Sequence, residues 1–263
     1  MSSQAPTSNI KYGMVIDLDK CTGCGTCSVS CMTENNIYIL EDETDKNRSI
    51  TWLRIYRLEN GEAFPNAKVA YLPRPCMHCD AHAPCVSVCP PIATTQDEIG
   101  GIVSQITTRC IGCRYCMAAC PYHVRYFNWF DPWPLYMEHV NPMTEALNPD
   151  VAPRMRGVVE KCTFCHHRLM AAKDKAYTGG KRIIPEDDYQ TACTQACPAK
   201  AITFGDLNNP EHQVHKLLKA RKSHAFRLLE KLKTEPKVWY LSSQEWIRKK
   251  GDNSLDLPKG KGY

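Results

Sequence analysis

Short runs of β-branched residues ahead of cysteine-rich loops are the first pattern along the chain. Residues 13–21 and 101–110 each end such a run at a cysteine, which predicts a short strand that delivers the chain into the loop. Residues 51–60 alternate apolar and polar side chains, and we expect a strand that extends the sheet. Between residues 90 and 109, Ile and Val flank Gly100–Gly101, which predicts a β-hairpin.

Helical periodicity occurs in the second half of the chain. Residues 166–177 predict a basic helix that ends at Gly179–Gly180. Residues 211–233 predict one amphipathic helix, whose apolar face either packs on the core or lies on a membrane surface. Its apolar positions recur at helical spacing: Val214, Leu217, Leu218, Leu229 and Leu232.

Residues 126–157 are rich in Pro, Trp, Tyr and Phe and have no sustained period, which predicts a long ordered loop. Its aromatic side chains either anchor a partner protein or cover the interior from water. Short strands mixed with a few helices place the chain in the α+β class.

The composition is that of a globular protein without a membrane span. The chain has 263 residues, of which 43% are hydrophobic, and nowhere do about eighteen uncharged apolar residues run together. Residues 1–13 contain neither an apolar core nor a twin arginine, so we expect no secretory signal.

The net charge is +5, and residues 211–263 carry 13 Lys or Arg against 6 Asp or Glu. This basic segment is expected to be a solvated surface, with phosphate, lipid headgroups or an acidic partner as alternatives; no feature indicates nucleic acid.

Sixteen cysteines fall into four blocks with none left over. Blocks one and three share the spacing C-x2-C-x2-C-x3-C, block two has a longer central gap, and block four is split into two pairs. Three blocks end in Cys-Pro, whereas Met32 follows block one. In order, the blocks are Cys21, Cys24, Cys27 and Cys31; Cys76, Cys79, Cys85 and Cys89; Cys110, Cys113, Cys116 and Cys120; and Cys162, Cys165, Cys193 and Cys197.

This spacing is typical of cubane iron–sulfur clusters. Three thiolates of one tight loop converge on one cube, and in two-cluster ferredoxins the fourth ligates the other cube. Zinc sites need only two pairs of ligands, which leaves the third cysteine and the terminal Cys-Pro unexplained. Disulfide scaffolds are typically short secreted chains. His78 and His123 offer the elements of a Rieske site, but they accompany complete all-cysteine blocks, so we expect them to lie outside the ligand sets.

Blocks one and three are related by a constant offset of 89 residues at all four cysteines, which indicates a duplication. The hairpin between blocks two and three predicts that these two form one compact unit, and blocks one and four then form the other. The fold is expected to be α+β, with two ferredoxin-like two-cluster units, long inserted loops and a C-terminal helical extension. The predicted divisions are an inner unit (70–127), an outer unit (11–40 with 158–205), connecting segments (41–69 and 128–157) and a basic helical extension (206–263).

If each fourth thiolate crosses to the sister cube, the cysteines divide into four ligand sets. A longer gap between Cys79 and Cys85 tolerates a missing iron, so a 3Fe-4S cluster in the inner unit is an alternative to four 4Fe-4S clusters. The inner sets are Cys76, Cys79, Cys85 and Cys120, and Cys110, Cys113, Cys116 and Cys89. The outer sets are Cys21, Cys24, Cys27 and Cys197, and Cys162, Cys165, Cys193 and Cys31.

A basic residue precedes each block, and a cation near an anionic cluster raises its reduction potential; chance placement is the alternative. These residues are Lys20, Arg74, Arg109 and Lys161. No Ser-His-Asp set, phosphate loop, GxGxxG turn or radical-enzyme C-x3-C-x2-C triad is present in the sequence. We therefore expect a chain that transfers electrons and is not itself catalytic.

With these motifs the sequence resembles the four-cluster iron–sulfur subunits of the complex iron–sulfur molybdoenzyme superfamily. The stretches YFNWFDPWP, RGVVEKCTFC, TACTQACPAKAITFGDLNNP and PKVWYL look most like those of the menaquinone reductase and alternative complex III branch. The resemblance implies three partners: an NrfD-type integral membrane quinone subunit, a molybdopterin-oxidoreductase-like subunit and, in that branch, a multihaem cytochrome c. It also implies that the cluster on Cys110, Cys113, Cys116 and Cys89 lies nearest the quinone and is the place where 3Fe-4S variants occur.

The resemblance favours a peripheral position on the periplasmic face of the inner membrane, with the cytoplasmic face as the alternative. The expected function is to wire the quinone-reactive membrane subunit to a periplasmic redox partner. A subunit of a soluble or cytoplasmic-facing molybdoenzyme, formate dehydrogenase or hydrogenase complex is the second hypothesis, and a structural metal protein is the third.

Overall fold

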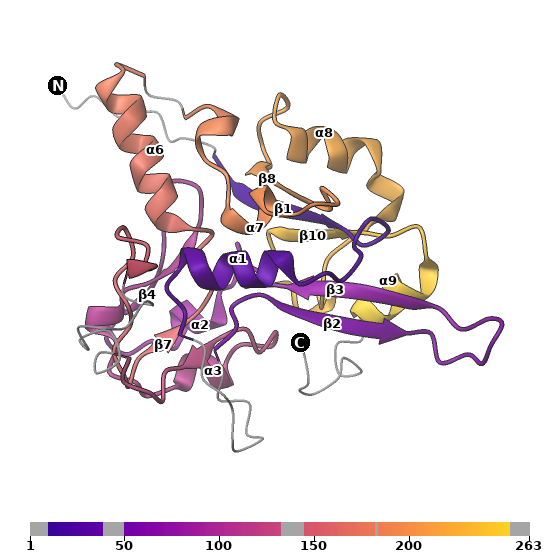
Figure 1. Cartoon of the computed structure of the whole chain (residues 1–263), viewed down its shortest axis with the longest axis horizontal. Helices are drawn as coiled ribbons and strands as arrows, with labels where there is room; N and C mark the ends of the chain where they lie inside the picture. Colours follow the sequence, from indigo (N-terminus) through magenta and orange to yellow (C-terminus); the bar gives the residue numbers. More distant parts are fainter. Residues whose placement is uncertain (1–9, 39–49, 133–144, 182–183, 253–263) are drawn as a thin grey trace.

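The computed structural model describes residues 10–38, 50–132, 145–181 and 184–252 (Figure 1). Its largest sheet has four strands in the order β8–β1–β10–β9. β1 runs antiparallel to β8 and parallel to β10. The four strands are β1 (Tyr12–Asp17), β8 (Ile202–Asp206), β9 (Ala225–Phe226) and β10 (Val238–Leu241).

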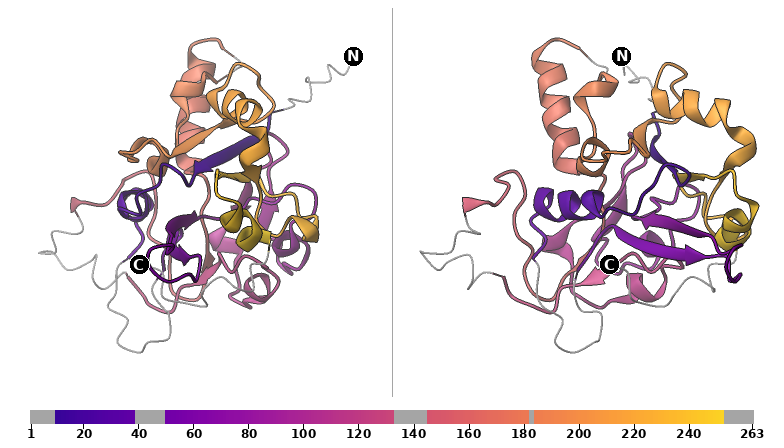
Figure 2. Two further views of the ribbon diagram at one scale, coloured as in Figure 1. Left: turned by 90° about the vertical axis from the view of Figure 1, so that its right-hand side faces the viewer. Right: turned by 45° about the vertical axis from the view of Figure 1, so that its right-hand side comes forward.

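Both faces of this sheet are buried, as the unbroken apolar run of β1 requires. Met14 and Ile16 belong to the main core, whereas Val15 packs with Leu241 in a second cluster under α8 (Gln213–Ala220). α8 lies over β8 and β1 (Figure 1). Figure 2 shows α8 on the same side of the molecule as the longer helix α6. The central strand therefore leads directly from the core into the first cysteine block.

Three further sheets have two strands each. The strand predicted within residues 51–60 is present as β2, but the prediction that it extends the main sheet is wrong. β2 forms a separate sheet with the next strand along the chain, because a short connection closes this hairpin at low entropic cost. The predicted hairpin at Gly100–Gly101 is confirmed, and both glycines have the positive φ that the turn requires. The pairs are β2 (Arg54–Glu59) with β3 (Val69–Arg74), β4 (Thr94–Gln96) with β5 (Val103–Gln105), and β6 (Tyr126–Phe127) with β7 (Val159–Glu160).

Most of the other helices are short. The predicted helix over residues 166–177 is confirmed as α6 (His166–Thr178), which ends at Gly179. Of the loop predicted over residues 126–157, residues 133–144 lie outside the described ranges. The remaining helices are α1 (Thr26–Glu34), α2 (Pro84–Ser87), α3 (Tyr115–Ala118), α7 (Ala192–Gln195) and α9 (Glu245–Asp252), with 3-10 turns η1 (Thr107–Arg109), η2 (Glu186–Asp188), η3 (Lys222–His224) and η4 (Glu230–Leu232).

The helix predicted over residues 211–233 is shorter than expected, and the described part of the basic helical extension predicted over residues 206–263 contains strands as well as helices. α8 ends at Ala220, and the chain then turns through η3 into β9. Leu229 is buried but has a left-handed φ of 50°, and Leu232 is 46% exposed, so neither continues the apolar face of α8. β10 adds a strand beside β1 instead, because this pairing satisfies the backbone groups of a segment in which all residues but Trp239 are buried.

Strand pairing brings distant cysteine blocks together. β1 leads into block one and pairs with β8, which follows block four. β5 leads toward block three and pairs with β4, which follows block two. The cysteine-bearing helices also contact one another in pairs, α1 with α7 and α2 with α3. Blocks one and four, and blocks two and three, are therefore neighbours, in a mixture of helices and strands compatible with the α+β class.

Candidate functional site

Each C-x2-C turn contains a backbone corner in the left-handed region. The residue before the second cysteine has a φ of 71° at Gly23, 45° at His78, 70° at Gly112 and 54° at Phe164. This region costs an L-residue about 1–2 kcal/mol and is open to glycine. The four blocks thus share this corner, although only blocks one and three have glycine at it.

Gly112→Ala is expected to disrupt block three far more than Gly25→Ala disrupts block one. A Cβ at Gly112 would lie 2.1 Å from the carbonyl oxygen of Gly157, whereas a Cβ at Gly25 would meet nothing within 4 Å. Both glycines have positive φ, so strain of about 1 kcal/mol is common to the two variants. We expect Gly25→Ala to show only this loss in thermal unfolding, and Gly112→Ala to lose further stability and bound iron. Equal losses would show that the approach of Gly157 is not structurally important.

The structure brings the sixteen cysteines into four groups, called quartets 1 to 4. Quartets 1, 3 and 4 each line a separate cavity. In quartet 2, burial raises the pKa of Cys31, followed by the charges of Cys162, Cys165 and Cys193, and then of Cys27 in quartet 1. Their members are those of the ligand sets expected if each fourth thiolate crosses. Quartet 1 is Cys21, Cys24, Cys27 and Cys197; quartet 2 is Cys31, Cys162, Cys165 and Cys193; quartet 3 is Cys76, Cys79, Cys85 and Cys120; quartet 4 is Cys89, Cys110, Cys113 and Cys116.

The electrostatic influence of thiols on one another orders the quartets as 1–2–3–4. At each junction, the charge of a thiol in one quartet adds to burial in raising the pKa of a thiol in the next. The pairs are Cys27 with Cys193, Cys162 with Cys76, and Cys116 with Cys85.

Solvent reaches only the two ends of this line. Cys24 in quartet 1 and Cys113 in quartet 4 are exposed, whereas all eight cysteines of quartets 2 and 3 are buried. An electron donor or acceptor in solution can therefore approach quartets 1 and 4 closely, and quartets 2 and 3 are screened by protein on all sides.

The donor set fits a cluster with several metal ions. Burial raises the pKa of Cys27, Cys79 and Cys193 to about 12, so these side chains are neutral thiols at neutral pH unless a metal displaces their protons. Within the described ranges, no three His, Cys, Asp or Glu side chains converge tightly enough to hold a single metal ion. The cysteines surround cavities instead, and four thiolates around four irons match that arrangement.

Backbone N–H groups point at the cysteine sulfurs, as they do around iron–sulfur clusters. Ala93 donates to Cys89 over 3.2 Å, and Ala201 donates to Cys197 over 3.3 Å. Each donor lies four residues after a cysteine that is followed by proline and crosses to the sister block. Blocks two and four therefore stabilise their crossing cysteines with the same backbone hydrogen bond. A thiolate accepts these hydrogen bonds better than a thiol does, which favours the ligand form.

Arg125 is a residue of the site that sequence reasoning missed. Its side chain lines the cavity of quartet 3 and is 3% exposed. Nη2 donates to Thr94 Oγ1 over 2.8 Å and to Gln105 Oε1, while Nε and Nη1 are buried without an oxygen or nitrogen acceptor, and the guanidinium lies beside the thiols of Cys85 and Cys116. A buried guanidinium with two such donors at a cysteine cavity fits cluster sulfur as the acceptor. Arg125 follows Cys120 at a spacing that no motif marks, so the sequence offered no signal.

Two aromatic rings lie between quartets 2 and 3. His78 and Phe164 stack with centroids 3.7 Å apart at an interplanar angle of 20°. His78 is fully buried and accepts the backbone N–H of Val103 at Nδ1 over 3.2 Å, and burial holds its pKa well below the ordinary value. It is therefore a neutral ring in the interior. His123, the other histidine next to a block, is exposed.

The basic residues ahead of the four blocks differ in environment. Lys20 and Arg109 are exposed, so water screens their charges. Arg74 is buried and stacks 4.1 Å from the centroid of the Tyr56 ring. Lys161 is fully buried, and its Nζ donates to two backbone carbonyl groups, those of Val103 and Cys162.

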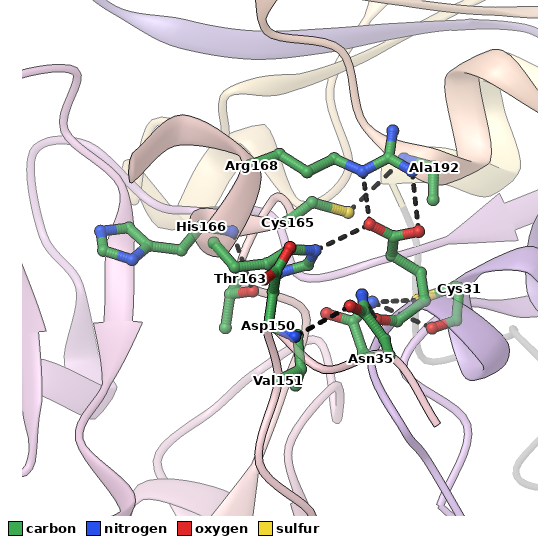
Figure 3. A network of polar contacts seen from close by, with 12 residues as sticks. Cys31, Asn35, Asp150, Val151, Thr163, Cys165, His166, Arg168 and Ala192 are labelled. Carbon is green, nitrogen blue, oxygen red and sulfur yellow. Dashed lines mark hydrogen bonds and ion pairs between the residues drawn. The ribbon is translucent and has the colours of Figure 1, made fainter. Parts of the chain in front are cut away.

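A polar network fastens α1 to α6 beside quartet 2 (Figure 3). Glu34 accepts Nη2 of Arg168 over 2.7 Å and contacts His167 Nε2 over 2.7 Å. These hydrogen bonds, that of Arg168 first, lower the pKa of Glu34. Figure 3 also shows the contacts of Asn35 with Cys31 and of the Ala192 N–H with the Cys165 sulfur. The charge of Arg168 is thereby neutralised next to quartet 2.

Among the described residues, no helix has the length and apolar character needed to cross a membrane.

Two family models of 4Fe-4S dicluster domains match the chain, one over residues 67–132 and one over residues 20–93 and 109–201. The menaquinone reductase iron–sulfur cluster-binding subunit of Nitratidesulfovibrio vulgaris is 60% identical over 256 residues, which cover 96% of this chain and 97% of that protein. The Hdr-like menaquinol oxidoreductase iron–sulfur subunit 1 of Archaeoglobus fulgidus is 36% identical, over 88% and 82% of the two chains. Protein NrfC of Escherichia coli is 33% identical, over 88% and 81%. These similarities span most of both chains in every pair.

Proposed function

The chain belongs to the 4Fe-4S dicluster family, among the iron–sulfur subunits of the molybdoenzyme superfamily, and from this we propose that it conducts electrons along four clusters held by quartets 1 to 4. It is an iron–sulfur electron-transfer subunit of the kind found in menaquinone reductase and related respiratory reductases. The observation that carries the proposal is the single file of four quartets with an exposed cysteine at each end.

We assign the ligands as the members of each quartet, with one thiolate in each crossing from the sister block. A bound cluster supplies one-electron chemistry, and the chain supplies position and environment. N–H donors such as those of Ala93 and Ala201 stabilise the ligand thiolates, and the buried walls of quartets 2 and 3 exclude water. All four cysteines of quartet 4 line its cavity, which favours a 4Fe-4S cluster over a 3Fe-4S cluster there.

The proposed partners lie at the two ends of the line. We place an NrfD-type membrane subunit with its quinone site next to quartet 4, and a molybdopterin-oxidoreductase-like subunit, with or without a multihaem cytochrome c, next to quartet 1. The resemblance to menaquinone reductase subunits and the exposure of Cys24 and Cys113 support this arrangement. We propose that the complex lies on the periplasmic face of the membrane.

The test uses the complex purified from membranes under anaerobic conditions. Iron and sulfide analysis with low-temperature EPR should give four clusters, and a menaquinone analogue should reoxidise the reduced clusters only while the membrane subunit is attached. Isolation of the chain in a soluble enzyme complex without a membrane subunit would support the soluble-complex hypothesis instead. Protease treatment of spheroplasts should degrade the chain; protection until lysis would contradict the periplasmic location.

A further inference from the structure

Two cations are buried at quartet 3 with no acidic side chain to balance them among the described residues. Arg125 lines the cavity, and Lys161 reaches the carbonyl oxygen of Val103, which lines the same cavity. Neither takes part in an ion pair there with Asp or Glu. Burying an unbalanced cation is unfavourable, so an anion must lie close to both.

Each of the other quartets has less buried positive charge among the described residues. None of the described residues that line the cavity of quartet 1 is charged. Arg168 beside quartet 2 is balanced by Glu34, whereas Lys161 also reaches the carbonyl oxygen of Cys162 and is therefore shared by quartets 2 and 3. Arg114 at quartet 4 is exposed to screening water. A third lysine near quartet 3, Lys237, is paired with Asp80 over 3.6 Å and adds little.

Quartets 2 and 3 make a direct comparison, because all their cysteines are 9% exposed or less. Solvent access is therefore equal, and the remaining differences are hydrogen bonds and charge. Quartet 2 receives several N–H and O–H donors, for example from Ala192 and Thr191, which also favour the reduced state. These are dipoles at 3.2–3.5 Å. Lys161 acts on both quartets, but quartet 3 has in addition the whole charge of Arg125 in a low-dielectric interior, where charges act most strongly.

We infer that Arg125 and Lys161 make the cluster of quartet 3 the most easily reduced in the chain. The inference rests on the proposed function, since it needs clusters in the quartets. Each added electron makes a four-thiolate cluster more negative, so two fixed cations stabilise the reduced form more than the oxidised form. Arg125 also reaches toward Cys116, so quartet 4 feels part of the same charge. An electron entering from quartet 4 is thereby drawn inward to quartet 3.

The experiment is an EPR-monitored redox titration of the full-length chain loaded with clusters, in which the signal altered by Cys79→Ser identifies quartet 3. We expect that signal to be reduced first in the wild type. Arg125→Gln should lower the ratio of reduced to oxidised quartet 3 cluster at a given potential at least tenfold. This corresponds to a midpoint potential about 59 mV lower for a one-electron couple. Arg125→Lys, which keeps the charge, should retain most of the wild-type potential, and Lys161→Met should act in the same direction as Arg125→Gln.

The matched controls are Lys20→Gln and Arg109→Gln, which remove exposed charges ahead of other blocks and should leave all potentials unchanged. The inference is overturned if quartet 3 is not reduced first, or if Arg125→Gln and Arg125→Lys have equal potentials. If Arg125→Gln fails to assemble clusters, Lys161→Met is the remaining test, and an unchanged quartet 3 potential in that variant would overturn the inference. A wild-type chain without four clusters refutes the proposed function, whereas four clusters in another order of reduction refute only this inference.

Discussion

Removal of the iron is expected to unfold the chain. Ten of the sixteen cysteines are buried, and most of them belong to the main hydrophobic core. The helices α2, α3 and α7 have four residues each, far too few to persist without the cluster loops they carry. Loss of the clusters would also leave Arg125 and Lys161 buried without an anion. Structural zinc sites in small domains contribute about 10–16 kcal/mol to folding, which is as large as the whole stability of an ordinary domain, and we expect a comparable dependence on the clusters here.

The measurement is anaerobic treatment with a chelator and oxidant, followed by circular dichroism and thermal unfolding. We expect the cooperative transition to disappear together with the cluster absorbance. Ferrous iron with sulfide should restore both, and zinc, which cannot build a cube, serves as the control that should restore neither. An apoprotein that still melts cooperatively would show that the sheet around β1 holds the fold without the clusters.

Cysteine spacing predicts which ligands of each quartet come from one loop, because two cysteines separated by only two residues must share one turn. The crossing of the fourth thiolate depends on strand pairing, and here the sequence offered the duplication and the hairpin around Gly100–Gly101. The hairpin is a short-range signal, and the structure confirms it. The pairing of β1 with β8 joins residues as far apart in sequence as Tyr12 and Asp206, and follows only from the need to place block four beside block one.

Long-range burial explains what sequence reasoning could not reach. The apolar spacing from Val214 to Leu218 predicts a helix correctly. Leu229 is also buried, but its backbone is in the left-handed region, and in the sequence a buried leucine there cannot be distinguished from one on a helix. The parallel strand β10 needed knowledge of its distant partner β1. His78 and Phe164 occupy the left-handed corner of the C-x2-C turn, where blocks one and three have glycine. Their stacking against each other in the structure is the reason we find for this difference.

Loss of quartet 2 is expected to stop electrons from crossing the chain. The thiols of quartet 1 influence the pKa of thiols only in quartet 2 among the other quartets, so no route around quartet 2 is indicated among the described cysteines. The double variant Cys31→Ala/Cys162→Ala removes one ligand from each of the two blocks that meet there. We expect the iron content to fall by one cluster in four and end-to-end transfer to fall to background, while the quartet 3 and quartet 4 signals remain and report a folded chain.

The measurement is freeze-quench EPR of the purified complex with menaquinol as the donor, which tests the order as well as the need for quartet 2. In the variant, electrons that enter at quartet 4 should reduce quartet 3 and leave quartet 1 oxidised. The matched control Cys21→Ala/Cys24→Ala removes the terminal quartet 1, so quartets 4, 3 and 2 should be reduced as in the wild type. Reduction of quartet 1 at the normal rate without quartet 2 would mean that the quartets do not form a single file.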